Sequence, residues 1–342
     1  MDPDYIIDNQ GELIIAILNP NAPFAVWENA DCSPVTENNS PQSPAASEVT
    51  DTAMKNPKAD ERGEPKTVRI RASAKHLSHA SPVFKALLKD KIVNPAGPIE
   101  LTVHDWDVKC FLLFLRILHG QSHKIPQWVT VEQLAKVTVM ADHYDCEKVV
   151  RSTASRYIEF LEYTMPITYS RETILWIWLG FFFRLSRVFE SCTSIAMEDA
   201  PGLISSLGLP IPDKIIDLMN KLRINGISKV LETLYQQHDF YLQDETACPS
   251  ECKDIMLGAL ARQLHARKLL FPRPVPPYVG HKYGSLRKVK LFRSPLLLEE
   301  RYQEDQDGLI YRLHNCETSD FGELFAHLDS RIFGLELGNY IR

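Results

Sequence analysis

The chain has 342 residues, of which 44% are hydrophobic and 24% charged, with a formal net charge of -6 and a pI near 6.0. This length is enough for one large or two ordinary domains, and the composition is that of a globular protein. The net negative charge gives no electrostatic reason to expect nucleic acid as the main partner, and it argues against a membrane surface.

Cysteine usage and the apolar segments bear on the cellular compartment. The seven cysteines are an odd number scattered along the chain, which is not a disulfide framework and is typical of a reducing interior. The acidic start at 1–5 lacks the positive region of a secretory signal. The most apolar run, 174–183, has about half of the roughly twenty residues that cross a bilayer. We therefore expect an intracellular protein, in the cytoplasm or nucleus, with a buried helix at this run and no membrane partner.

The first ordered segment is predicted to be a strand. Residues 11–18 are apolar and rich in β-branched side chains, and 24–27 could supply an antiparallel partner. From 28 to 66 the chain loses aromatic residues and becomes rich in Ser, Pro, Asn, Asp and Glu. Such a composition cannot bury enough apolar surface to offset its ordering entropy, so we expect a disordered insertion. It contains three Ser-Pro sites for proline-directed phosphorylation, at Ser33, Ser40 and Ser43.

Order is predicted to resume with a strand at 67–71, followed by two short helices over 73–88 that are joined at Ser81-Pro82. Ser81 can cap the second helix, and proline suits the first helical position because its missing N–H is not needed there. Helical spacing places one set of apolar side chains on the inner face of this pair: Leu77, Ala80, Phe84, Leu87 and Leu88.

One more strand and three more helices are predicted before residue 163. Residues 98–103 alternate like a half-exposed strand, and Asp105 or Asp107 can cap a helix that Gly120 ends. Thr130 and Gln133 have the spacing of a capping box. Strands that come first and helices that come after them predict an α+β domain. The apolar stripes of the last two helices are Leu134, Val137, Ala141 and Tyr144, then Val150, Ala154, Tyr157, Ile158 and Leu161.

Four segments together resemble a BTB/POZ domain. They are the strand at 67–71, the Ser-Pro helix pair, the apolar helix at 111–120 and the Ala-Asp-x-Tyr end of the helix at 137–146. The amino-acid sequence of these segments most resembles that of the BTB proteins of filamentous fungi. The resemblance implies a BTB/POZ domain over 1–162, a small mixed sheet with flanking helices that the insertion 28–66 interrupts. A mostly α-helical region would follow over 163–342.

The resemblance implies a protein–protein interaction module with no chemistry of its own. Members of the family homodimerise or hold a cullin scaffold in ubiquitin ligases. Few residues precede the strand at 11–18, so we expect at most a weak homodimer. The family's hydrophobic-x-Glu cullin motif is missing from 88–92, so a cullin adaptor is a less favoured alternative. Glu12 takes the place of the family's buried Asp, with Ala74 where a basic residue is usual.

The pairing surface that this resemblance implies is the exposed side of the first helix pair. Its inner face is committed to the core, whereas its outer residues are small, cationic or imidazole-bearing. The expected interface residues are Lys75, His76, His79, Val83, Lys85 and Ala86.

Four helices are predicted after residue 163. Apolar side chains form one wide stripe over 175–189, and a second long helix covers 215–235, with Gly226 as its candidate break. A third helix is expected over 255–270 and a last one over 324–332.

Other motifs in the chain give weak signals for chemistry. Cys248, Cys252 and His265 could supply three zinc ligands, but structural zinc usually needs four. The calcium-like stretch 304–308 lacks both key carboxylates, and His76 with His79 has no obvious third ligand. With no phosphate-loop, nucleophile-elbow or dinucleotide motif in the chain, we expect no catalytic residues, cofactor or metal. An enzyme with a site assembled from scattered residues remains the least favoured alternative.

Two further stretches have a structural and a functional interpretation. The basic stretch 282–293 could serve a nuclear regulator as an import patch, but its alternation favours an exposed strand. Residues 274–277 meet a minimal PxxP spacing, but a rigid connector between helices is the favoured interpretation.

Overall fold

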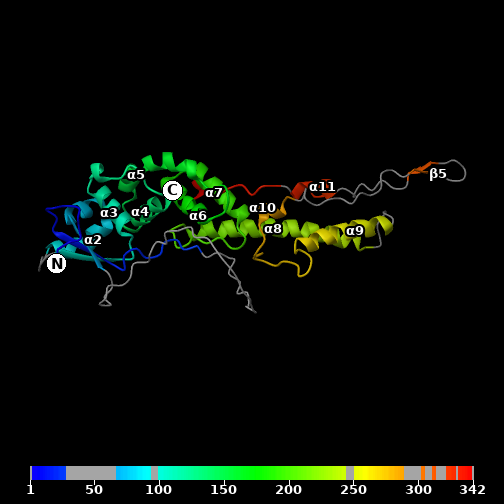
Figure 1. Cartoon of the computed structure of the whole chain (residues 1–342), viewed down its shortest axis with the longest axis horizontal. Coiled ribbons are helices and arrows are strands. Elements are labelled where there is room, and N and C mark those ends of the chain that lie inside the picture. The colour runs from blue at the N-terminus through cyan, green and yellow to red at the C-terminus, as the bar shows by residue number, and fades with distance from the viewer. Residues whose placement is uncertain are drawn as a thin grey trace, which may run out of the picture. The chain divides into compact units, whose positions relative to one another are not determined.

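The computed structural model describes residues 2–27, 67–93, 99–243, 250–288, 302–304, 310–312, 321–328 and 330–340. It is a mixed α and β structure, mostly helical, with one four-stranded sheet (Figure 1). The chain forms two compact units: unit 1 is residues 1–164 with 207–210, and unit 2 is residues 165–206 with 211–342. In the described ranges no helix combines the length and the apolar character needed to cross a bilayer. The predicted disordered insertion 28–66 lies outside the described residues.

The sheet of unit 1 contains β1 (Tyr5–Ile6), β2 (Leu13–Leu18), β3 (Thr67–Ala72) and β4 (Ile99–His104), in the order β1-β3-β2-β4. β2 pairs antiparallel with β3 and parallel with β4, and β1 pairs parallel with β3. Every second residue of β2 is fully buried, as its alternating pattern requires.

Two features of this sheet differ from the sequence expectations. The prediction that 24–27 pairs with the first strand is wrong, because β3 and β4 occupy both edges of β2 and residues 24–27 have no strand structure. The two-residue strand β1 was not predicted, since two residues carry no periodic pattern.

The helices of unit 1 begin where the capping residues indicate. The Asp107 side chain accepts a hydrogen bond from the Cys110 N–H at 3.0 Å, so Asp107 and not Asp105 is the cap. Thr130 and Gln133 form the expected capping box. The elements are α1 (Ala74–Ala80), α2 (Pro82–Val93), α3 (Val108–Leu118), η1 (Ser122–Lys124), α4 (Val131–His143), α5 (Glu147–Leu161) and η2 (Glu162–Thr164).

The core of unit 1 confirms the predicted inner faces. Phe84 has no exposed surface, and its ring stacks on that of Tyr144 with 4.2 Å between centroids. Leu87 is an exception, because 48% of it is exposed, so the inner face of α2 is narrower than predicted. The other core side chains expected together are all at most 8% exposed: Leu77, Leu112, Leu115, Leu134 and Tyr144.

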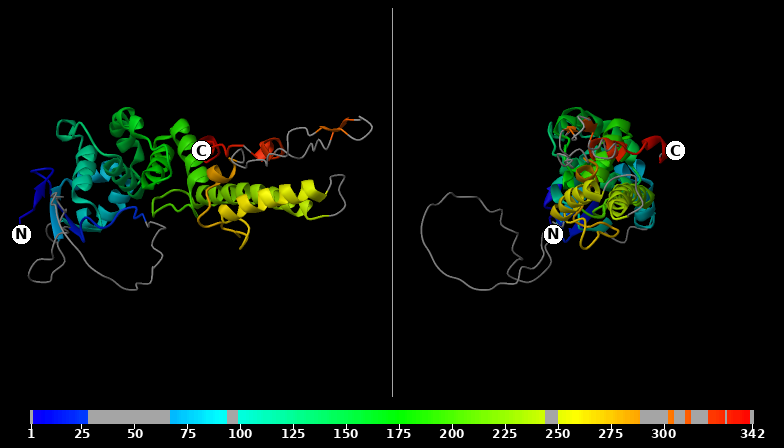
Figure 2. Two further views of the ribbon diagram at one scale, coloured as in Figure 1. Left: turned by 45° about the vertical axis from the view of Figure 1, so that its right-hand side comes forward. Right: turned by 90° about the vertical axis from the view of Figure 1, so that its right-hand side faces the viewer.

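Unit 2 consists mainly of helices (Figure 2). The apolar run 174–183 is a buried helix, as expected. The elements are α6 (Arg171–Phe183), α7 (Ser186–Asp199), α8 (Asp213–Tyr241), α9 (Ser250–Ala266), α10 (Tyr283–Leu286), β5 (Tyr302–Glu304), β6 (Ile310–Arg312), α11 (Phe321–Leu324), η4 (Ala326–Leu328) and η5 (Leu337–Asn339).

The predicted helix boundaries of unit 2 need three corrections. The stripe over 175–189 is two helices, because Arg184 adopts a left-handed conformation with φ of 59° and ends α6. α8 runs unbroken through Gly226, so this glycine does not break the helix. A Cβ at Gly226 would lie 2.8 Å from the Tyr283 ring, so the missing side chain lets this ring pack against α8. The last predicted helix is two short pieces, α11 and η4.

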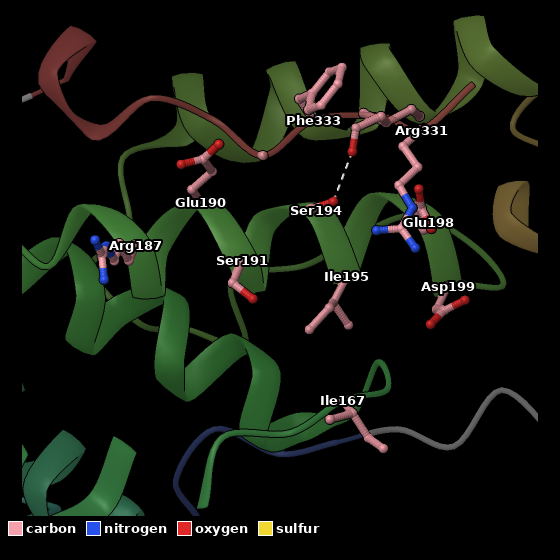
Figure 3. Close-up of a pocket in the computed structure, with 12 residues that line it drawn as sticks. Ile167, Arg187, Glu190, Ser191, Ser194, Ile195, Glu198, Asp199, Arg331 and Phe333 are labelled. Atoms are coloured by element: carbon pink, nitrogen blue, oxygen red, sulfur yellow. Dashed lines mark hydrogen bonds between the residues drawn. The ribbon is translucent and has the colours of Figure 1, made fainter. Parts of the chain in front are cut away.

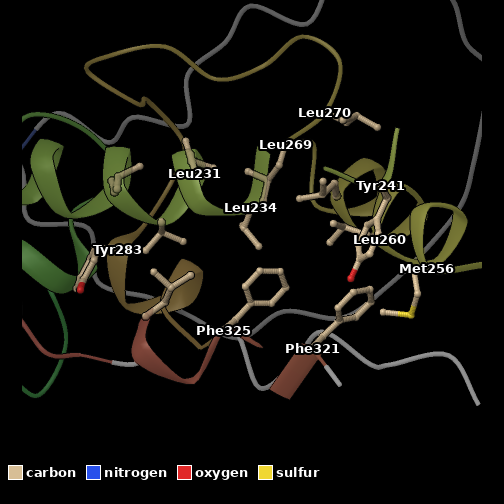
Figure 4. Close-up of a cluster of buried hydrophobic side chains, with 14 of the residues drawn as sticks. Leu231, Leu234, Tyr241, Met256, Leu260, Leu269, Leu270, Tyr283, Phe321 and Phe325 are labelled. Carbon is tan, nitrogen blue, oxygen red and sulfur yellow. The ribbon is translucent and has the colours of Figure 1, made fainter. Parts of the chain in front are cut away.

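A continuous apolar cluster fills the space between α8, α9 and the segment 321–328 (Figure 4). Leu234 from α8, Leu260 from α9 and Phe321 from α11 have no exposed surface. The phenyl rings of Phe321 and Phe325 stack with 5.8 Å between centroids. This cluster holds α8 and α9 together as a pair that lies side by side (Figure 2).

Candidate interaction surface

The helix pair α1–α2 is fixed in place by two serines. Ser73 caps α1, and its Oγ accepts a hydrogen bond from the His76 N–H at 3.4 Å. Ser81 is 1% exposed; its Oγ accepts from the Phe84 N–H at 3.0 Å and donates to the main-chain carbonyl of Tyr144. One hydroxyl therefore caps α2, as predicted, and also ties its start to the end of α4.

The outer face of this pair carries the residues predicted to form an interface. Lys75, His76, His79, Lys85 and Ala86 are exposed, and Val83 is partly buried. The exposed side of Leu87 adds apolar surface to them. The structure thus places all six side chains where a partner could reach them, and their role in binding remains a prediction.

His119, which sequence reasoning missed, lies beneath one edge of this face. Its ring stacks on that of His76 with 5.1 Å between centroids. Its Nε2 accepts the Ser73 N–H at 3.1 Å, and its Nδ1 lies 2.8 Å from the Leu115 carbonyl, which can only accept, so the proton belongs on Nδ1. Burial lowers the pKa of His119. The only sequence signal was its place beside Gly120 at a helix end.

Three of the buried thiols are not activated as nucleophiles. Burial raises the pKa of Cys110, Cys146 and Cys192 to about 12, so these thiols stay protonated and unreactive near neutral pH.

No metal site forms in the part of the chain that the structure describes. Cys252 is buried in the core of unit 2 while His265 is exposed, and Cys248 lies outside the described residues, as does most of 304–308. Cys252 and His265 therefore do not converge on a metal as the zinc hypothesis requires.

Unit 2 has a hollow of about 510 Å³ between α7 and the segment 331–334 (Figure 3). The segment lies close to the helix because Gly334 has no side chain: a Cβ there would be 1.8 Å from the Glu190 carbonyl oxygen. Ser194 Oγ donates to the Ile332 carbonyl at 2.8 Å and is thereby occupied. Arginines and carboxylates both line the hollow, and none of the described residues that line it is a histidine. The hollow therefore favours neither acid–base chemistry nor a ligand of one charge.

The basic stretch 282–293 and the proline-rich residues 274–277 have structural roles in the parts that the structure describes. The exposed strand expected over 282–293 is wrong for its first part, because Tyr283–Leu286 is a helix. Arg287 is 8% exposed and pairs with Glu198 at 3.2 Å, while residues 289–293 lie outside the described ranges. Residues 274–277 connect α9 to α10, in line with the favoured interpretation.

No protein-family description matches the chain, and no curated protein or solved structure matches it either. The fold and the surface define a two-unit α and β protein. Its clearest candidate for function in unit 1 is the outer face of α1 and α2, whose inner face is committed to the core.

Proposed function

We propose that the chain is a non-enzymatic protein–protein interaction protein of the BTB/POZ type, which binds through the outer face of α1 and α2. The observation that carries the proposal is the role of Ser81, which holds the helix pair against α4 while the six outer residues stay accessible. The order of elements in unit 1 also supports it: the short strand β1, two antiparallel strands, a helix pair, a fourth strand and three α-helices.

The chemistry of the outer face suits a modest interface. Val83, Ala86 and Leu87 offer apolar area, and His76 and His79 offer flat rings with polar atoms. Protein interfaces combine such an apolar centre with a polar rim. The apolar part is small, and small interfaces form weak or transient complexes.

The first expected partner is a second copy of the chain. β1 is paired with β3 of the same chain, so a dimer that exchanged β1 would first have to break this pairing. We therefore expect a dimer that dissociates on dilution.

Size-exclusion chromatography with light scattering over a range of concentrations tests this proposal. The double variant Val83→Glu, Ala86→Glu places two like charges on the face and should be monomeric at every concentration, with an unchanged circular dichroism spectrum. The matched control Gln127→Glu, Ser152→Glu adds the same charge at exposed positions outside α1 and α2 and should still dimerise.

A pull-down with the wild-type chain and both variants extends the test to other partners. A protein that binds the wild type and the control but not the Val83, Ala86 variant would use this face. If the double variant keeps both its dimer and its partners, the function does not reside on α1 and α2.

A further inference from the structure

Unit 1 contains a second surface feature, a hollow of about 310 Å³ that the α1–α2 face does not include. Its walls come from α3, from the loop that follows η1 and from the start of α4. The residues that matter to its chemistry are Lys109, Arg116, Lys124, Trp128 and Gln133.

The loop that forms one wall is held by α5. The Tyr157 hydroxyl, on a side chain that is 3% exposed, donates to the Pro126 carbonyl at 2.5 Å, and Arg156 donates to the same oxygen at 3.4 Å. The indole of Trp128 meets the ring of Phe160 edge to face, with 5.0 Å between centroids. These contacts fix the shape of the hollow before any ligand arrives.

The hollow has positive charge only. Lys109, Arg116 and Lys124 line it, and no carboxylate does among the described residues. The acidic side chains of the neighbouring helix starts, Asp107 and Glu132, are both bound to Lys136, at 3.0 and 2.8 Å. Because these two carboxylates share one lysine, one net negative charge remains at the helix starts. The three cations that line the hollow outnumber it, so the hollow still attracts an anion.

Arg116, in the wall of the hollow, has a side-chain N–H group without an acceptor among the described residues. One of its terminal nitrogens donates to the Lys124 carbonyl at 3.3 Å, but its Nε is buried and has no acceptor in the described part of the chain. A buried N–H group without an acceptor is rare in folded proteins and calls for an explanation. Because this Nε is buried, an anion in the hollow could accept from it only if the Arg116 side chain turned outward.

We infer that this hollow binds a phosphorylated serine or threonine within an extended segment of a partner protein. Lys109, Arg116 and Lys124 would share the phosphate oxygens, and the Gln133 side chain would add an amide donor. A neighbouring apolar residue of the segment would rest on Trp128, which is 67% exposed, and on Phe160, which is 53% exposed.

Two features favour a phosphorylated peptide over a simple carboxylate or a free anion. A phosphate carries close to two negative charges and three acceptor oxygens, which matches three cations better than one carboxylate does. The exposed Trp128–Phe160 pair lies directly beside these cations, and apolar surface of this kind contributes nothing to an inorganic ion but binds a side chain. This inference does not depend on the function proposed for α1 and α2.

Fluorescence anisotropy with labelled short peptides tests the inference on the full chain. The probe has one phosphoserine followed by leucine and flanked by glutamates, and the comparison peptides have serine or glutamate in its place. We expect the phosphorylated peptide to bind at least about tenfold more tightly than either comparison. Its affinity should fall as the ionic strength rises, since exposed charges are screened by salt.

Variants then locate the binding. Lys109→Glu with Lys124→Glu should weaken the phosphopeptide at least about tenfold, and Trp128→Ala should weaken it with little change in salt dependence. The control Lys89→Glu with Lys148→Glu makes the same change in net charge at exposed positions outside the hollow and should bind as the wild type does. The pair Lys109→Gln, Lys124→Gln replaces the first variant if its melting curve shows unfolding.

The inference is wrong if the glutamate peptide binds as tightly as the phosphopeptide. It is equally wrong if the control weakens binding as much as the Lys109, Lys124 variant does, or if no peptide binds. None of these results bears on the dimer test of Val83 and Ala86, because that test uses a different surface and a different readout.

Discussion

Phe84 in unit 1 and Arg223 in unit 2 are both large side chains with no exposed surface, yet they stabilise their units in opposite ways. Phe84 stacks on Tyr144 and contributes apolar contact only. Arg223 donates hydrogen bonds to four main-chain carbonyls, of Ala200, Pro277, Tyr278 and His281, at 2.7 to 3.1 Å.

The comparison shows what each kind of interior can hold. Apolar packing fixes whole elements against each other, as it fixes α2 against α4. The guanidinium of Arg223 instead fixes irregular backbone, the proline-rich connector between α9 and α10. Buried carbonyls in such backbone need donors from outside it, although that of Tyr278 also accepts the His281 N–H at 3.2 Å. Burial lowers the pKa of Arg223, but an arginine stays charged near neutral pH, and its donors remain in place.

The largest expected effect comes from removing this arginine. Arg223→Met keeps a similar length but leaves four carbonyls without their donor, which should lower the local stability by about 4–5 kcal/mol. Hydrogen exchange measured by mass spectrometry should show loss of protection over 268–288. Arg223→Lys should lose less, and Arg262→Met, at an exposed position of α9, should change nothing measurable. Equal effects of the Arg223 and Arg262 variants would refute this account.

Phe84→Ala is the matching test in unit 1. It removes a fully buried ring and should cost about 3–5 kcal/mol, a typical large-to-small change in a core. Because α2 and α4 share the Phe84–Tyr144 stack, protection should fall in both helices together. Leu87→Ala on the same helix should cost much less, since Leu87 is 48% exposed. The core assignment would not survive a Phe84→Ala cost as small as that of Leu87→Ala.

The same comparison explains what the sequence could reveal. Phe84, Leu77 and Tyr144 were predictable because helical spacing identifies an inner face, and Ser81, Asp107 and Thr130 because caps have local signatures. The partners of Arg223 are main-chain carbonyls 23 to 58 residues away, and a carbonyl carries no mark in the sequence.

The two candidate sites also differ in how far the sequence reveals them. The exposure of the α1–α2 face followed from its periodicity. The hollow around Arg116 did not, because its walls meet only after η1, α3 and α4 have packed, and Tyr157, which holds its loop, is 31 residues from Pro126. Of the residues that give it chemistry, only Gln133 stood out in the sequence, and that was as part of a capping box.

Gly334→Ala should have an intermediate effect and tests a third kind of contact, a close approach of backbones. The new Cβ would be 1.8 Å from the Glu190 carbonyl oxygen, so the segment 331–335 must move away from α7, at a cost of about 1–3 kcal/mol. The hydrogen bond from the Leu335 N–H to Thr193 Oγ1, now 2.9 Å, should break. Limited proteolysis should then cut near 331–335. Gly338→Ala is the control, because none of the described residues lies within 4 Å of its Cβ position. Comparable cleavage of the Gly338→Ala variant would contradict the prediction.

The smallest expected effect is the response of unit 1 to pH through His119, which is partly buried and hydrogen-bonded through both ring nitrogens. Its Nε2 accepts the Ser73 N–H only while the ring is neutral. Burial lowers its pKa below the ordinary value of 6.5, and His76 adds to this, while the hydrogen bond to the Leu115 carbonyl and the charges of Asp8 and Glu12 act in the opposite direction.

Between the folded and unfolded pKa values of His119, the unfolded chain binds more protons than the folded one. The contribution of His119 to stability is therefore complete above about pH 6.5 and is lost as the pH falls toward the lower, folded value. The wild type should melt at a lower temperature at pH 5.5 than at pH 7.5, and His119→Gln should flatten part of this difference. The part should be small, because one neutral hydrogen bond contributes about 1 kcal/mol. His123→Gln, at an exposed position, is the control, and if it flattens the profile as much as His119→Gln does, the pH response does not arise at the start of α1.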